Sequence, residues 1–338
     1  DIFFGDNRDG ANAQTVLTTG GVVDYSLINI QPDWSGGTST YNDYTLQTIF
    51  HEIGHALGLG HQGFYNLVGD FGADREFDND SWQSSMMSYF AQTENFHVVA
   101  DLALLQSPMA VDWMALDDLY AGQGFGVANA FTDDTVWGFN TTVTSDVSDI
   151  WATWSDWADA TASTLVDGGG IDTLDLSGYD DNTLISLVET TRDALVPSFS
   201  NIGGLFGNLT LAEGTVIENA IGGAGAETFW GNDADNRLVG NGGQDTFHDS
   251  DGADTYVGGS GTDLVRFDGN FGDYAFDLFE DTIEVIGNAV TDVVDATVDF
   301  LSFLDRTLSW RALADEIAPG AADVLPDETP EPGPVRPG

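Results

Sequence analysis

The sequence predicts an α+β domain, with a mixed twisted sheet and one helix that carries candidate functional residues, followed by an all-β parallel roll. Three observations support this prediction. Three histidines and a glutamate are spaced for one helix and the turn after it between His51 and His61, whereas short strands separated by Gly and Asp dominate from Asp133 onward. From Gly222 to Arg266 the chain divides into consecutive nonapeptides that follow the pattern GGxGxDxUx, which is typical of a parallel roll.

The composition allows two folded domains and excludes several classes of function. The 338 residues exceed the roughly 100–200 of one domain, and the 42% hydrophobic residues, with 21 Phe and 9 Trp, argue against disorder. There is no Cys, so disulfides, thiol catalysis and a cysteine zinc site are excluded. No apolar run approaches the roughly 18 residues of a membrane helix, so we expect no membrane insertion.

The charge is strongly negative. Acidic residues number 56 against 8 basic ones, and the basic residues are all Arg. Repulsion from phosphate groups excludes nucleic acid as a partner. Two explanations of the acidity apply together: carboxylates that calcium neutralises, and a hydrated acidic surface suited to saline water, where repulsion is screened.

Local patterns predict the elements in order. We expect a strand at Ile2 to Phe4, a Gly/Thr-rich turn, a strand at Val22 to Ile30, a polar loop with Pro32, Gly36 and Gly37, a helix at Tyr44 to Leu59, a loop-rich stretch at 62–106 and a helix at Met109 to Tyr120. The change of texture near Gly122 to Asp133 divides the chain into domains at 1–125 and 126–316. A Pro- and acid-rich linker or tail follows at 317–338.

Three tryptophans, Trp151, Trp154 and Trp157, recur at three-residue spacing in the second domain. A sugar-stacking stripe is one interpretation, but core packing explains large aromatic side chains better.

The strongest functional signal is the segment His51-Glu52-Ile53-Gly54-His55, which continues to Gly58 and His61. On a helix His51 and His55 lie one turn apart on the same face, so both imidazoles can reach one ion. Gly58 can adopt the left-handed conformation that ends a helix, which lets the chain bring back His61 as a third ligand. Three protein ligands leave one position open, which is typical of catalytic zinc.

Glu52, next to the first ligand, is placed to take a proton from water at that open position. The arrangement predicts peptide-bond hydrolysis, in which the same carboxylate acts first as base and then as acid. A buried structural histidine cluster is the alternative, and the number of matching positions argues against it. The two other histidines, His97 and His248, receive no role.

The segment resembles the metzincin motif HExxHxxGxxH. Met87-Ser88-Tyr89 further downstream is similar to the Met-Ser-Tyr of the serralysin branch, and Ser107-Pro108-Met109 through Tyr120 resembles the helix that closes that family's catalytic domain. The resemblance implies a metzincin fold for the first domain. It also implies that Met87 forms an apolar floor under zinc and that Tyr89 is a movable phenol ligand that steadies the transition-state oxyanion.

Only 50 residues precede His51, whereas serralysins have a longer amino-terminal half. The sequence shown either starts late or has a reduced half. We expect the edge strand that holds an extended substrate at Val22 to Ile30.

The nonapeptides predict calcium sites. Each combines a glycine-rich turn, which exposes carbonyls, with a short strand that points one apolar side chain inward, and two repeats form one coil. Position eight is apolar throughout, and carboxylates two repeats apart, such as Asp245 and Asp263, should stack. The candidate ligands in the repeats are Gly223, Gly225, Glu227, Asn236, Gly240, Gly242, Gly243, Asp245, Asp254, Gly258, Gly259, Gly261 and Asp263.

Two repeats are imperfect, since Asn236, Asp249 and Ser250 depart from the pattern, and sites there should be weak or empty. An outlying copy, Asp167 to Asp175, should start the same sheet, and it adds Gly169 and Gly170 to the candidate ligands. The resemblance to serralysins implies that Asp167, Asp172 and Glu218 also bind calcium. A Gly/Asp-rich loop region is the alternative, but in-phase repeats with an apolar column argue against it.

These observations together predict a secreted, extracellular, zinc-dependent endopeptidase with a calcium-stabilised RTX roll. We expect one catalytic Zn²⁺, several structural Ca²⁺ ions, protein or peptide substrates and a monomer. A bacterial export route without a signal peptide fits such a chain. The competing hypothesis is a calcium-dependent binding or adhesion module with an inactive protease domain, against which the intact Glu52 argues.

Overall fold

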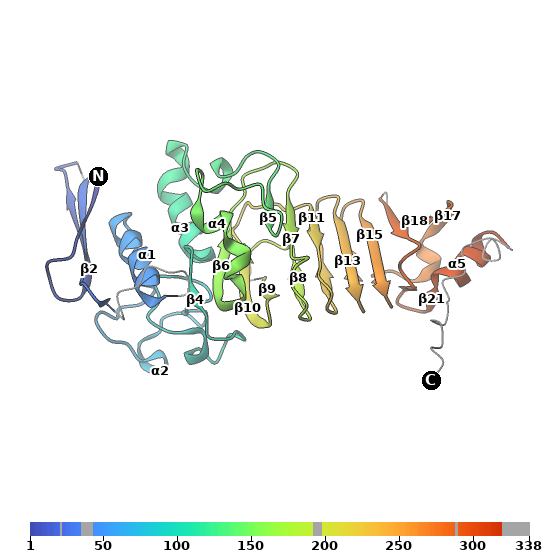
Figure 1. Cartoon of the computed structure of the whole chain (residues 1–338), viewed down its shortest axis with the longest axis horizontal. Helices are drawn as coiled ribbons and strands as arrows, with labels where there is room; N and C mark the ends of the chain where they lie inside the picture. Colours follow the sequence, from blue (N-terminus) through green and yellow to red (C-terminus); the bar gives the residue numbers. More distant parts are fainter. Residues whose placement is uncertain (21, 35–42, 192–197, 288–289, 320–338) are drawn as a thin grey trace, which may run out of the picture.

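The computed structural model describes residues 1–20, 22–34, 43–191, 198–287 and 290–319 and has an elongated shape (Figure 1). A small sheet and the helices α1 and α3 lie at one end, and a long roll of parallel strands extends to the other (Figure 1). The expected glycines of the polar loop, Gly36 and Gly37, and most of the expected tail lie outside the described residues.

The amino-terminal sheet contains β1 (Ile2–Gly5), β2 (Ala11–Leu17) and β3 (Val23–Ile30), in the order β1-β3-β2. Strand β1 runs parallel to β3, whereas β2 is antiparallel to it. The prediction therefore missed β2, whose residues were assigned to a turn. The prediction that residues 22–30 form the edge strand is also wrong, because β3 lies between two partners and β2 is the edge beside α1.

Helix α1 (Tyr44–Ala56) begins at the cap Asp43, whose side chain accepts the Thr45 N–H. It ends three residues before the predicted Leu59, because Gly58 has φ +102° and the Leu59 N–H returns to the carbonyl of Gly54. Helix α3 (Ala110–Tyr120) starts one residue after the predicted Met109, which is its cap. The stretch between them is loop-rich as predicted, with only α2 (Phe71–Asp74), β4 (Leu104–Leu105) and a 3-10 turn among its described residues.

The roll consists of two facing sheets that share one apolar core. The eight-stranded sheet contains β5 (Val136–Gly138), β7 (Thr173–Asp175), β11 (Asn219–Ile221), β13 (Arg237–Gly243), β15 (Thr255–Gly261), β19 (Thr291–Asp295), β18 (Thr282–Ile286) and β17 (Ala275–Leu278). The six-stranded sheet contains β8 (Leu184–Ser186), β12 (Thr228–Trp230), β14 (Thr246–His248), β16 (Leu264–Arg266), β20 (Phe300–Ser302) and β21 (Thr307–Ser309).

The parallel pairing confirms that two repeats form one coil. Phe229 pairs with Phe247 and Phe247 with Val265 in one sheet, while Leu238 pairs with Tyr256 in the other. All five side chains at position eight are fully buried. The eight-stranded sheet begins one strand before the outlying copy, at β5, which pairs with β7.

Two details of the predicted roll are wrong. Strands β13 and β15 continue through the glycines, because Asn241 pairs with Gly259 and Gly243 with Gly261, so the predicted short strands are longer in this sheet. The end of the roll is not entirely β, since α5 (Trp310–Ile317) buries Leu313 and Ala314 against the core. The Ser309 hydroxyl caps this helix.

A short sheet joins the two expected domains. It contains β4, β6 (Thr161–Leu165), β10 (Leu205–Leu211) and β9 (Ser200–Ile202), and β4 pairs in parallel with β6. Next to it lies the short helix α4 (Asp149–Ala152). Trp154 and Trp157 are buried in the roll core and Trp151 packs against it, which confirms core packing for the tryptophans.

Candidate metal centre

The three predicted zinc ligands converge. One nitrogen from each of His51, His55 and His61 lies within 4.8 Å of the others. His51 and His55 come from consecutive turns of α1, and His61 comes from the loop that returns after Gly58. The structure therefore brings the three histidines together, as the spacing in the sequence predicts.

Hydrogen bonds fix which ring nitrogen faces the centre. The Nδ1 atoms of His51, His55 and His61 lie 2.8, 2.9 and 2.9 Å from the carbonyl oxygens of Met86, Leu59 and Tyr65. Because a carbonyl only accepts, each Nδ1 carries the proton and each Nε2 keeps its lone pair. The Nε2 atoms of His55 and His61 are 3.0 Å apart, so two lone pairs face each other. A cation between them suits this donor set, and imidazole nitrogen suits zinc.

Burial favours the neutral, metal-binding form of these rings. It lowers the pKa of His51 to about 4 and also lowers the pKa of His61. Both rings therefore lack a proton on Nε2 at neutral pH.

Glu52 directly follows His51 on α1 and lines the same cavity as His51. Its side chain is buried, and its Oε2 has no hydrogen-bond partner within the described part of the chain. Burial raises the pKa of Glu52 to about 7, while a hydrogen bond from the Ala13 N–H in β2 acts in the opposite direction. A carboxyl group with a pKa near neutrality can both take and return a proton.

The methionine turn lies directly under α1. Met86 and Met87 are buried, and a Cβ on Gly54 would lie 2.5 Å from the Met87 sulfur. Asp112 of α3 holds this turn, since it accepts the Ser85 hydroxyl and the Met86 N–H, both at 2.6 Å. No role was predicted for Asp112 from the sequence. Its place among apolar residues in the first turn of α3 is the signal that could have indicated one.

The methyl added by Gly54→Ala overpacks a closed core at a cost of about 1–3 kcal/mol. Helix propensity returns about 1 kcal/mol, so we expect a net destabilisation of up to about 2 kcal/mol. Urea denaturation of the zinc-free chain in saturating calcium measures the effect. Gly60→Ala is the matched control, since a Cβ there meets nothing within 4 Å. Equal stability of the two variants would contradict the packing argument.

Tyr89 lies beside the histidines. Its ring centroid is 4.5 Å from that of His61 and 6.0 Å from that of His51. Its hydroxyl accepts the Leu67 N–H at 3.4 Å. The structure therefore brings Tyr89 next to His51 and His61.

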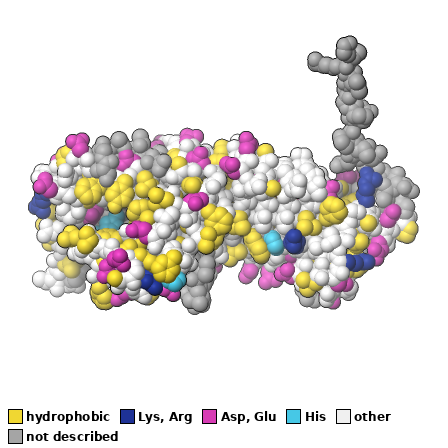
Figure 2. All heavy atoms as spheres, turned by 90° about the horizontal axis from the view of Figure 1, so that it is seen from below, with side chains coloured by type: hydrophobic (Ala, Val, Ile, Leu, Met, Phe, Trp, Pro, Cys, Tyr) yellow, Lys and Arg dark blue, Asp and Glu magenta, His cyan; other side chains and the backbone are white. Residues whose placement is uncertain are grey.

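A cavity of about 460 Å³, which is within the size range of ligand sites, opens beside His51. Side chains of α1, β2 and the methionine turn line it, including Ala11, Tyr44, Thr48, His51, Glu52, Trp82 and Tyr89. Figure 2 shows apolar side chains around one cyan histidine patch at this end of the molecule.

The predicted calcium ligands next to the six-stranded sheet, Glu227, Asp245 and Asp263, form one column along the roll. The Glu227 N–H donates to Asp245 Oδ1 at 2.8 Å, and the Asp245 N–H donates to Asp263 Oδ1 at 2.9 Å. Their remaining oxygens, both of Glu227 and the Oδ2 of Asp245 and Asp263, are buried without a partner among the residues the structure describes. Buried carboxylate oxygens without donors fit a hard cation such as Ca²⁺.

Burial and mutual repulsion raise the pKa of Glu227 to about 8 and that of Asp245 to about 6. The turn glycines allow the coils to approach closely. Gly261 has φ +142°, and a Cβ there would overlap the carbonyl oxygen of Gly243. The other predicted glycine ligands, Gly169, Gly170, Gly223, Gly225, Gly240, Gly242, Gly258 and Gly259, lie in turns or in β13 and β15.

The calcium candidates Asn236 and Asp254, next to the eight-stranded sheet, differ from this column, because their side-chain oxygens already have hydrogen-bond donors. The Asn236 amide donates to the Glu218 carbonyl and to Asn232, and Asp254 Oδ2 accepts the hydroxyls of Ser250 and Tyr256. Neither Asn236 nor Asp254 has a buried side-chain oxygen without a partner in the described chain. This difference fits the expectation that the imperfect repeats have weak or empty sites.

Asp254 also belongs to an acidic cluster that was not predicted from the sequence. One oxygen each of Asp249, Asp254 and Asp292 lie within 4.8 Å of one another. Asp292 lies beyond the nonapeptides, so no repeat pattern could have indicated it.

The three ligands suggested by the resemblance also lie together. The Asp172 N–H donates to Glu218 Oε2 at 2.7 Å, and Asp172 Oδ2 is buried without a partner in the described chain. Burial, and further the charge of Asp172, raise the pKa of Asp167 to about 7. Asp167 Oδ2 already accepts the Trp137 indole N–H.

Comparison with known proteins shows which protein family this chain resembles. Residues 127–269 match the family described as Peptidase M10 serralysin C terminal. The chain is 38% identical over 210 residues to the metallopeptidase AprA of Pseudomonas marginalis, which covers 59% of this chain and 40% of that protein. It is 41% identical over 190 residues to serralysin C of Dickeya chrysanthemi, covering 54% and 35%.

A serralysin of Photorhabdus luminescens is 37% identical over 205 residues, covering 58% of this chain and 38% of that protein. The chain is thus similar to serralysin-type metallopeptidases, and its residues 127–269 match the carboxyl-terminal domain of the M10 serralysin family. It spans about two fifths of the length of these curated relatives. None of the helices in the described part of the chain has the length and apolarity to cross a membrane.

Proposed function

We propose that this chain is a zinc-dependent endopeptidase whose carboxyl-terminal roll is stabilised by calcium. One observation carries the proposal: three imidazoles converge with their Nδ1 atoms held by backbone carbonyls, and the buried Glu52 lines the same cavity as His51. His51, His55 and His61 would hold the zinc. When bound, zinc lowers the pKa of water and polarises a peptide carbonyl.

The residues of the chain would move the protons and steady the charge. Glu52 Oε2 takes a proton from the attacking water and passes it to the leaving amine. The Tyr89 phenol donates a hydrogen bond to the oxyanion that develops on the substrate. Met87 and Asp112 keep the floor of the site in place.

An extended peptide would pair with the edge strand β2. This strand has β3 on one side, and its residue Ala11 lines the cavity with His51 and Glu52. An unpaired strand edge offers N–H and carbonyl groups to a peptide at regular intervals. Peptide substrates would therefore lie between β2 and the histidines.

The roll would bind calcium where carboxylate oxygens lack donors. Glu227, Asp245 and Asp263 form the strongest site region, and Asp167, Asp172 and Glu218 form a second. We place the catalytic domain at 1–125, the RTX roll at 126–316 and a tail at 317–338. Calcium dependence and an acidic surface suit a secreted, extracellular protein, and we propose that it is active as a monomer.

Casein hydrolysis with and without a zinc chelator tests the proposal. We expect hydrolysis that the chelator abolishes and that added Zn²⁺ restores. A calcium-dependent adhesion module with an inactive protease domain predicts no hydrolysis under any of these conditions. The convergence of the three histidines and the buried Glu52 on the same helix favour the enzyme.

Tyr89→Phe tests the role of the phenol. We expect the turnover number to fall by roughly 100-fold or more with little change in KM, as for the loss of one oxyanion donor. Steady-state kinetics on a fluorogenic peptide measure both parameters. An unchanged turnover number would make Tyr89 a packing residue only.

A further inference from the structure

Asp80 is a buried acidic residue that belongs to none of the motifs above. It is fully buried in the loop between α2 and the methionine turn. Its Oδ1 accepts two hydroxyl groups, from Tyr65 at 2.9 Å and from Ser88 at 2.7 Å. One carboxylate oxygen therefore joins the loop after His61 to the methionine turn.

Tyr65 supports two members of the metal centre. Its carbonyl accepts the Nδ1–H of His61 at 2.9 Å, and its ring stacks on that imidazole at 5.5 Å between centroids. The same ring lies 4.9 Å from the ring of Tyr89. A movement of Tyr65 would therefore change the positions of His61 and Tyr89 together.

Ser88 fixes the backbone on both sides of Tyr89. It directly precedes Tyr89, and its hydroxyl oxygen accepts the Phe90 N–H at 3.1 Å. The hydroxyl proton goes to Asp80. The backbone that carries the phenol is thus held by the same carboxylate as Tyr65.

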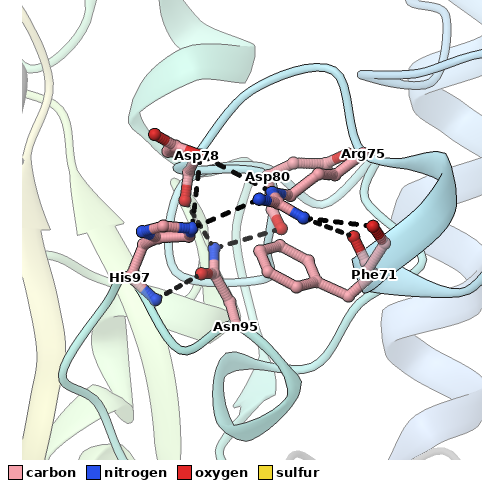
Figure 3. A network of polar contacts seen from close by, with 7 residues as sticks. Phe71, Arg75, Asp78, Asp80, Asn95 and His97 are labelled. Atoms are coloured by element: carbon pink, nitrogen blue, oxygen red, sulfur yellow. Dashed lines mark hydrogen bonds and ion pairs between the residues drawn. The ribbon is translucent and has the colours of Figure 1, made fainter.

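The backbone of Asp80 is itself held by a polar network (Figure 3). The Asn95 amide donates to the carbonyls of Asp78 and Asp80, and its oxygen accepts the His97 N–H. The carboxylate of Asp78 lies 3.5 Å from Arg75 and 3.3 Å from His97. The Asn95 amide therefore holds the backbone of Asp80, whereas the Asp78 carboxylate lies at the exposed rim of the network.

We propose that Asp80 is a positioning residue of the metal centre, which holds Tyr65 against His61 and Ser88 beside Tyr89 through one shared acceptor oxygen. The inference rests on the proposed function, because it concerns the same centre. Asp80 touches neither substrate nor metal, and it acts only through Tyr65 and Ser88.

The other oxygen, Oδ2, is buried and has no partner within the described residues. A fully buried carboxylate with one oxygen that lacks a donor is costly to the fold, so its presence calls for a structural or functional explanation. Asp80 therefore differs from loop residues that only fill space.

The test compares Asp80→Ala with Asp80→Asn in the whole chain. The alanine variant removes the acceptor, so zinc affinity and kcat should each fall by about 10- to 100-fold, as for other residues that orient metal ligands, with KM nearly unchanged. Asparagine can place an oxygen at the same point, so Asp80→Asn should recover most of both. Tyr65→Phe, which keeps the ring and loses the hydroxyl, should reproduce part of the loss.

Asp78→Ala is the matched control. It removes an exposed carboxylate from the same network without touching Tyr65 or Ser88, and both readouts should stay within about 2-fold of the parent. Circular dichroism verifies that each variant is folded. Unchanged zinc affinity and kcat in folded Asp80→Ala would overturn the proposal, as would equal losses in the alanine and asparagine variants.

Zinc affinity is measured by competition with a chromophoric chelator, which requires no peptidase activity. If the parent chain binds zinc but hydrolyses no peptide, the proposed function fails. The effect of Asp80 on zinc affinity would still decide the positioning role separately.

Discussion

Glu52→Ala should bind one zinc per chain with the affinity of the parent and lose nearly all proteolysis. Glu52 carries the proton but is not one of the three converging ligands, so its removal leaves the imidazoles in place. Loss of a general base and acid costs about 10²- to 10⁴-fold in rate. Zinc content from elemental analysis and peptide hydrolysis measured on the same sample separate the two effects.

His55→Ala is the matched comparison, because it removes a ligand from the same helix. This variant should lose the zinc itself, and its hydrolysis should fall with the metal content. If Glu52→Ala kept full activity, the proton-transfer role would be wrong. If His55→Ala kept one zinc at unchanged affinity, His55 would not be a ligand.

Calcium should fold the roll. Glu227, Asp245 and Asp263 stack within one column and leave buried oxygens without donors in the described structure, so each coil repels the next until a cation lies between them. Calcium that binds only the folded form adds about 2.7 kcal/mol per site at a concentration 100 times its Kd. We therefore expect the metal-free roll to unfold and a calcium titration to restore its strand signal in circular dichroism.

Low pH should partly replace calcium. In the metal-free fold the pKa of Glu227 is raised to about 8 and that of Asp245 to about 6, so the folded state binds more protons than the unfolded state. The stability of the metal-free roll is then highest near pH 4 and falls as the pH rises towards 8. Circular dichroism of the metal-free chain between pH 4 and pH 8 measures this effect, and the strand signal should be greatest near pH 4 and fall as the pH rises.

Sodium chloride at matched ionic strength is the control for simple screening. Refolding by sodium alone, or a metal-free roll that is already folded at pH 8, would contradict the calcium column. The acidity would then be explained by salt adaptation alone.

The features that were predicted correctly are those with a strict period or a strict spacing. The nonapeptide period fixed the apolar column, since Phe229 and Phe247 must both point inward when strands pair two repeats apart. The spacing of His51, His55 and His61 fixed their convergence, because helix geometry and one left-handed glycine leave little choice.

The features that were missed depend on contacts between distant segments. Strand β2 is assigned only once β3 and α1 lie beside it, and the short pattern at Ala11–Leu17 does not distinguish a strand from a turn. Asp80 and Asp112 are single acidic residues in an acidic chain. Only the partners that fold around them, Tyr65 and Ser88 for the first and Ser85 for the second, separate them from solvated carboxylates.

Anomalous diffraction at the zinc absorption edge, from crystals grown with zinc and calcium, tests the central claim most directly. The account predicts one strong zinc peak bounded by the Nε2 atoms of His51, His55 and His61, at about 2.0–2.1 Å from each. A peak bound through Nδ1, or no peak between these histidines in a zinc-saturated crystal, would contradict it.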